Sequence, residues 1–215
     1  MSKHSWQVAM VALTAGLGLT PSSAHSDDPN PIIAIEVDDR TGSFTARLPR
    51  AKSIASDIYR QAGVALQWSA GDETVVDRTL TVVITDSTSM SGRFAPGAMG
   101  VAPSPGDGTR GTLAYVFRDR VMAFADAHRL AHAYVLAAAL AHEIGHLLLP
   151  PNAHAPDGIM RGSWDPALFP PRVPGVPGFS PPEARLLRRR ARGPTAAPPV
   201  AAVSCACAVL DSATP

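Results

Sequence analysis

Two histidines and a glutamate near the middle of the chain have the spacing of a metal-binding helix. The segment reads His142-Glu143-Ile144-Gly145-His146 and matches the pattern HExxH. Four residues of an α-helix advance about 6 Å and turn about 400°, so both imidazoles project from one face toward one ion. Glu143 lies beside them, where a carboxylate can act as general base on a water that the metal activates. The pattern predicts a zinc site with a catalytic carboxylate.

A catalytic zinc ion needs a third protein ligand and one open position. His154 is the preferred candidate, because a proline pair must end the helix and the short loop after it can bring the chain back toward the helical ligands. Asp157 and Glu183 remain as alternative oxygen ligands, although zinc sites favour imidazole. We expect one catalytic zinc ion on His142, His146 and His154.

A second histidine pair, His128 and His132, repeats the four-residue spacing without the glutamate. His128 lies about 21 Å before His142 along one continuous helix, so the two pairs cannot share an ion. We therefore expect His128 and His132 to face solvent or to form hydrogen bonds.

The segment from His142 to Met160 resembles the metzincin zinc metallopeptidases, most closely their matrixin-like branch. Those proteins carry HExxHxxGxxH followed by a tight turn that contains a methionine. Here the helical motif is followed by His154 and then by Gly158-Ile159-Met160. The resemblance implies that the three histidines bind zinc, that Glu143 is the catalytic base and that Met160 lies in the turn beneath the metal.

The chain departs from this family pattern after the second histidine. Leu149 stands at the family's glycine and Asn152 at its third histidine, so His154 must reach the metal through a longer loop. The resemblance also implies an α+β, metzincin-like fold. That fold has a twisted, mainly parallel or mixed sheet of about four to five strands, two long helices above the zinc and a small irregular C-terminal subdomain with one helix.

Hydrophobic periodicity predicts the elements that position the motif. Strand-like segments bounded by turn residues lie at Ile32–Val37, Val64–Trp68, Leu80–Ile84, Met99–Val101 and Thr112–Phe117. Helical patterns predict a helix over Ala51–Gln61, a long helix that Asp126 caps and that ends near Leu148, and a short helix over Pro181–Arg190. We expect the strand Thr112–Phe117 at the edge of the substrate cleft, where an extended peptide can pair with it.

The two ends of the chain differ in composition from a folded domain. Residues 1–26 hold an apolar run over 8–19 and small residues up to Ala24, which predicts a secretory signal peptide whose apolar run is too short to span a bilayer. Residues 193–215 are rich in Pro and Ala and predict a disordered tail. The catalytic domain is then expected in residues 27–192, and the mature protein is expected to be secreted or otherwise extracytoplasmic.

Net charge and cysteine content limit the classes of partner and metal site that the chain can have. The 19 basic and 18 acidic residues give a formal net charge of +1, so no global field attracts nucleic acid or an anionic membrane. Cys205 and Cys207 are too close together for an unstrained disulfide and too few for a closed zinc site. The expected partner is a protein or peptide substrate, without nucleic acid and without a stable membrane anchor; nothing in the sequence indicates an oligomeric state.

Two functions agree with these residues. The first is a secreted zinc-dependent endopeptidase, in which Glu143 takes a proton from the activated water and passes it to the leaving amine. The alternative is a secreted zinc-binding protein without peptidase activity, which the altered spacing after His146 motivates. Glu143 favours the endopeptidase, because zinc binding alone does not need a carboxylate beside the two ligands.

Overall fold

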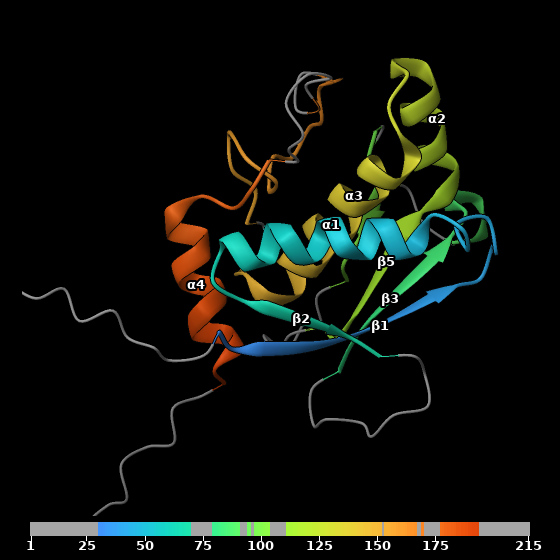
Figure 1. The fold of residues 1–215 in the computed structure, drawn as a ribbon. Helices are drawn as coiled ribbons and strands as arrows, with labels where there is room; N and C mark the ends of the chain where they lie inside the picture. The colour runs from blue at the N-terminus through green and yellow to red at the C-terminus, as the bar shows by residue number, and fades with distance from the viewer. Residues whose placement is uncertain are drawn as a thin grey trace, which may run out of the picture.

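The computed structural model describes the middle of the chain with several gaps, and Figure 1 shows its fold. The described residues are 30–69, 79–90, 94–95, 97–103, 111–151, 153–166, 169 and 177–193. The predicted signal peptide, residues 1–26, lies outside them, as do residues 194–215 of the predicted tail.

Five strands form one mixed sheet in the order β2-β1-β3-β5-β4. Neighbours among β1, β2, β3 and β5 pair in parallel, whereas β4 pairs antiparallel with β5. Parallel neighbours need a crossover connection, and helix α1 supplies it between β1 and β2. The predicted α+β fold with a mixed sheet is confirmed. The strands are β1 Ile32–Asp39, β2 Ala65–Trp68, β3 Thr79–Thr85, β4 Gly100–Val101 and β5 Leu113–Phe117.

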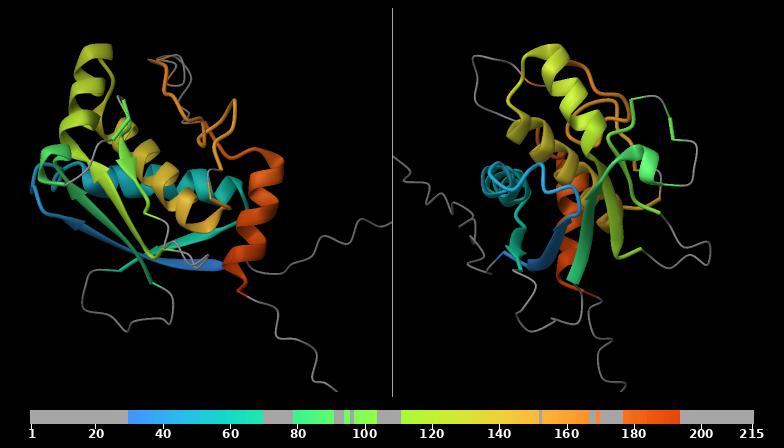
Figure 2. Two further views of the ribbon diagram at one scale, coloured as in Figure 1. Left: turned by 180° about the vertical axis from the view of Figure 1, so that it is seen from behind. Right: turned by 90° about the vertical axis from the view of Figure 1, so that its right-hand side faces the viewer.

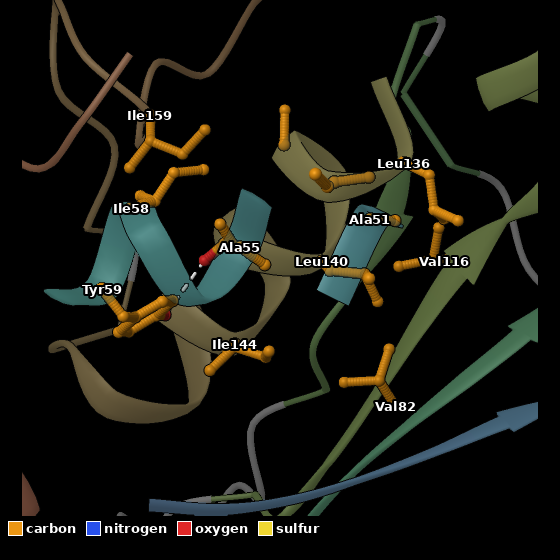
Figure 3. Packing of buried hydrophobic residues seen from close by; sticks show 14 of the residues in the cluster. Ala51, Ala55, Ile58, Tyr59, Val82, Val116, Leu136, Leu140, Ile144 and Ile159 are labelled. Atoms are coloured by element: carbon orange, nitrogen blue, oxygen red, sulfur yellow. Dashed lines mark hydrogen bonds between the residues drawn. The ribbon is translucent and has the colours of Figure 1, made fainter. Parts of the chain in front are cut away.

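Two long helices, α1 (Leu48–Gln61) and α3 (His132–Leu148), lie side by side on one face of the sheet (Figures 1 and 2). Val82 of β3 and Val116 of β5 lie beneath Leu136 and Leu140 of α3, and all four side chains are fully buried (Figure 3). Burial of these apolar side chains fixes the height of α3 above the strands.

α1 meets α3 through a stripe of small and branched side chains. Ala51, Ala55 and Ile58 recur at helical spacing and are buried, and the two alanines let the helix backbones approach closely. Tyr59 is fully buried, and its hydroxyl donates a hydrogen bond to the carbonyl oxygen of Ala141 at 3.0 Å. α1 is therefore tied to the turn of α3 that immediately precedes the first histidine of the motif.

The predicted single helix from Asp126 to Leu148 is wrong, because the structure contains two helices there. α2 (Arg118–His128) begins directly after β5 and ends where Arg129 adopts a left-handed conformation, with φ of 53°. The backbone amide of Leu130 donates to the carbonyl of Ala125 at 2.8 Å and closes the helix end. A glycine would have signalled this break, but the chain places an arginine there and leaves no local mark in the sequence.

The last described helix, α4 (Pro181–Ala191), agrees with its prediction. Its first turn is capped by Glu183, whose carboxylate accepts a hydrogen bond from the backbone amide of Ser180 at 2.7 Å. Arg188 donates to the carbonyl oxygen of Ala62 at 2.7 Å, at the C-terminal end of α1. The helix thus joins the irregular C-terminal segment to the helical layer.

Candidate metal centre

The apolar helix α3 presents the two motif histidines in one group. The Nε2 atoms of His142 and His146 lie 3.0 Å apart, as expected for imidazoles one helical turn apart that share a face. His142 is buried and His146 is half-buried. Two basic side chains are therefore held close together in a region that water reaches poorly.

A hydrogen bond from outside the helix sets the orientation of His142. Its Nδ1–H donates to the carbonyl oxygen of Ile159 at 2.8 Å, which leaves the Nε2 lone pair directed into the histidine group. Burial lowers the pKa of His142 to about 4 and that of His146 to about 3. Both imidazoles are therefore neutral near pH 7, which is the form that binds a metal ion.

His154 completes the group from the loop after α3. Its Nε2 atom lies 3.1 Å from Nε2 of His146, and one ligand atom from each of the three histidines lies within 4.8 Å of the others. The loop is held in place because the amide of Ala155 donates to the carbonyl of Met160 at 2.9 Å. The structure thus brings together the three histidines that the sequence predicted as ligands.

The three imidazole rings cannot satisfy one another's hydrogen bonds. Nε2 of His142 carries a lone pair and can only accept a hydrogen bond. If Nε2 of His146 carries a proton, it can donate to His142 but cannot accept a hydrogen bond from His154. If Nε2 of His146 carries a lone pair, it can accept from His154 but cannot donate to His142. One of the two short contacts must then lack a hydrogen bond. A divalent ion with affinity for imidazole satisfies all three lone pairs at once, so these residues fit a metal ion.

Glu143 is the buried acidic group beside the histidines. Its side chain is 3% exposed, and its Oε2 atom has no hydrogen-bond partner. Burial raises the pKa of Glu143 to about 8. The carboxylate packs against Gly100 of β4, where a Cβ atom would lie 2.7 Å from Oε1. A glycine at this position therefore leaves the space that Glu143 occupies.

Met160 lies against the helix between the two motif histidines. It is fully buried, and a Cβ atom at Gly145 would lie 2.5 Å from its sulfur. The turn that carries it uses Gly158 with φ of 79°, and the amide of Arg161 donates to the carbonyl of Gly158 at 3.3 Å. A tight methionine-containing turn thus supports the ligand-bearing turn of α3.

The alternative oxygen ligands do not join the group. Glu183 caps α4 through Ser180, and the side chain of Asp157 is exposed and outside the histidine group. Asn152 lies outside the described residues.

The second histidine pair is also separate from the centre. His128 is exposed at the end of α2 and packs edge-on against Phe124. Nε2 of His132 lies 2.9 Å from a carboxylate oxygen of Asp126, at the joint between α2 and α3. The expectation of solvent-facing or hydrogen-bonded histidines is confirmed for His128. It is wrong for His132, whose Nε2 atom is buried near Asp126 and forms no hydrogen bond. The two residues also lie on different helices.

A cleft of about 580 Å³ opens over the histidines. The edge strand β4, Ala102 and Pro103 line this cleft, and Arg161 and Trp164 line it as well. The prediction that Thr112–Phe117 forms the cleft edge is wrong, because β5 pairs on both sides and β4 lies outside it. Neither the order of these strands nor the presence of Arg161 and Trp164 in the cleft had a signal in the sequence.

A second hollow, about 780 Å³ in volume, lies at the carboxyl ends of β1, β3 and β5, away from the histidines. Arg118 and Asp86 line it and pair with each other at 2.6 and 2.9 Å. This pair satisfies both groups and ties α2 to the segment after β3, so we regard the hollow as structural.

Comparison with known proteins adds no family to this geometry. The chain matches no protein-family model, and no curated protein sequence matches it. Among the described residues, no helix combines the length and apolar character needed to cross a bilayer.

Proposed function

We propose that this chain is a secreted zinc-dependent endopeptidase of the metzincin type, with His142, His146 and His154 as zinc ligands and Glu143 as general base. One observation carries the proposal: a buried carboxylate with an unpartnered oxygen lies beside three converging imidazoles, all on the wall of one cleft. A site that only binds metal does not need that carboxylate, and its burial is costly.

Each residue has a distinct part in the proposed reaction. The three imidazoles would hold a zinc ion, which would supply a Lewis acid to polarise the substrate carbonyl and activate water. Glu143 accepts a proton from the attacking water and then delivers it to the leaving amine. Without a metal ion, burial raises the pKa of Glu143 to about 8. A cation on the three histidines would lower that pKa again and favour the ionised carboxylate, which is the form that accepts a proton. The bond from His142 to Ile159 keeps the imidazole in the tautomer that binds metal.

The edge strand supports a peptide as the substrate. β4 uses one edge to pair with β5, and no strand of the described chain pairs with its other edge. Gly100 to Pro103 line the cleft beside Glu143. An extended peptide can add to this edge through backbone hydrogen bonds, which would place a peptide bond across the histidines.

The N-terminus supports export of the protein. Residues 1–26 have the charge, apolar run and small residues of a signal peptide, and export by such a peptide agrees with an extracytoplasmic peptidase. N-terminal sequencing of secreted material is expected to find a mature chain that starts close to His25 or Asp27. An intact Met1 on a cytosolic, folded product would contradict export.

The decisive experiment compares Glu143→Gln with the parent on the same preparations. Zinc measured by elemental analysis is expected to stay near one ion per chain, whereas casein hydrolysis is expected to fall by about 10²- to 10⁴-fold. Glu36→Gln, on the half-buried strand position of β1, is the matched control and is expected to keep full activity. A chelator should abolish activity of the parent.

Other outcomes lead to different conclusions. If the parent binds zinc but cleaves no protein, the alternative of a zinc-binding protein without peptidase activity takes the place of the endopeptidase. If Glu143→Gln loses its zinc, the carboxylate is a ligand and the proposed division of roles is wrong.

A further inference from the structure

Arg161 is the one lysine or arginine among the described residues that line the cleft. Glu143 is the one acidic side chain among them, and it is buried beside the histidines. The cleft therefore carries one basic side chain, and the described residues that line it include no exposed acidic group to neutralise it.

The other half-buried arginines of the described chain all have polar partners. Arg118 pairs with Asp86, Arg120 donates to the carbonyl oxygens of Ala95 and Ala98 at 3.0 and 2.9 Å, and Arg188 donates to Ala62. Arg161 is half-buried too, yet its guanidinium has no hydrogen bond or ion pair within the described part of the chain. A guanidinium has five donors, and leaving them unmatched in a partly buried site is unfavourable.

The backbone holds Arg161 at a defined place beside the metal centre. Its amide donates to Gly158, and the residue forms a parallel bridge with Ala155 next to His154. The following residue, Gly162, packs so closely on the His154 ring that a Cβ atom would lie 3.1 Å from Nδ1. Arg161 is thus attached to the same short segment that positions the third histidine, rather than to a separate surface loop.

We propose that Arg161 binds a carboxylate of the substrate, so that the cleft selects acidic peptides. This inference rests on the proposed peptidase function and names its substrate class. A guanidinium binds a carboxylate through two parallel charge-assisted hydrogen bonds, which no amide can reproduce. A divalent ion on the three histidines adds positive charge to the same cleft, which also favours an acidic ligand.

Hydrolysis of matched peptides tests the proposal. One set of peptides differs in Glu or Gln on either side of the scissile bond, and a second set differs in a free or amidated C-terminus. We expect kcat/KM to be about 10- to 100-fold higher for the carboxylate member of one set, as for a charge-assisted hydrogen bond. The set that shows the preference identifies the source, a side chain or a chain end.

Variants at two arginines assign that preference. Arg161→Gln is expected to bring the ratio close to one, Arg161→Lys to keep part of it, and Arg161→Glu to shift the preference toward a peptide with Lys at the same position. Arg189→Gln, an exposed arginine of α4, is the matched control and should keep the full ratio. Equal rates on the two members of both sets, or a preference that survives Arg161→Gln, would overturn the proposal.

A binding measurement separates this proposal from the peptidase function. Fluorescence polarisation with labelled Glu and Gln peptides, with free and amidated ends, uses the Glu143→Gln protein with its zinc content measured. We expect tighter binding of the carboxylate peptide, and we expect this preference to disappear when Arg161→Gln is added to the Glu143→Gln protein. That result supports the carboxylate site even if the parent hydrolyses no peptide. In that event only the proposed peptidase function fails. Equal binding of carboxylate and amide peptides contradicts the site itself. If Arg161→Gln does not fold, the same binding comparison with Arg161→Lys tests the site. Lysine lacks the paired donors of the guanidinium, so the preference for the carboxylate peptide should weaken.

Discussion

Nε2 of His154 lies 3.1 Å from Nε2 of His146, although His154 is on the loop after α3 and comes later than the third histidine of the family pattern. The loop closes this distance because the Ala155 amide bonds to the Met160 carbonyl and Gly162 lets the chain pass close to the His154 ring. The extra loop length is therefore taken up by pairing with the methionine-containing turn.

Replacement of the third histidine should weaken metal binding. His154→Ala removes one of three ligands, so we expect zinc affinity to fall by more than the roughly 10- to 100-fold typical of a lost outer-shell partner. Competition with a chromophoric chelator measures the affinity. Asp157→Ala is the control, since Asp157 is exposed and outside the histidine group. Unchanged zinc affinity in His154→Ala would remove it from the ligand set.

A side chain at position 100 should disturb both the pairing of β4 with β5 and the position of the Glu143 carboxylate. A Cβ atom at Gly100 would meet the carbonyl oxygen of Tyr115 and the carboxylate of Glu143, and a backbone carbonyl cannot swing away. We expect Gly100→Ala to lower the free energy of unfolding by about 1–3 kcal/mol and to reduce peptide hydrolysis. Gly178→Ala is the control, because its nearest contact, with Gln61, lies at an ordinary 3.6 Å. Parent-like stability and activity of Gly100→Ala would contradict this packing.

Removal of one buried hydroxyl should loosen the contact between α1 and α3. Tyr59→Phe deletes the donor to Ala141 and keeps the ring that packs edge-on against Phe179. We expect urea denaturation to show a loss of about 0.5–1.5 kcal/mol in the free energy of unfolding, with unchanged zinc content. A variant as stable as the parent would mean that the hydrogen bond makes no net contribution.

The pH dependence of the metal-free protein should report the buried carboxylate. Burial raises the pKa of Glu143 from its usual 4.5 to about 8, so its contribution to stability is fully present below pH 4.5 and is lost as pH rises through 8. Glu143→Gln does not titrate, so we expect its stability relative to the parent to increase from pH 5 to pH 9 in the presence of chelator. The lowered histidine pKa values act equally in both proteins and cancel. Urea denaturation at the two pH values measures the difference, and a constant offset would contradict the raised pKa.

Local sequence patterns determined the elements and the helical half of the site. The spacing of His142 and His146 places both rings on one helical face in any fold, since a helix turns through the same angle wherever it occurs. The β-branched apolar run Ile32–Val37 likewise predicts a strand, and the helical spacing of apolar residues in Ala51–Gln61 predicts a helix. These inferences needed no contact between distant residues.

Tertiary structure decided what depends on contacts between distant segments. The break at Arg129 lacks a glycine, so packing of two helices and not residue preference ends α2 there. β4 lies outside β5 because Gly100 and Val101 pair with Val116 and Tyr115 across the sheet, a pairing that neither strand's own sequence reveals. The contact of His154 with His146 of α3 depends in the same way on a loop that folds back over the helix. Short-range preferences set elements, whereas long-range burial and hydrogen bonding set their arrangement around the site.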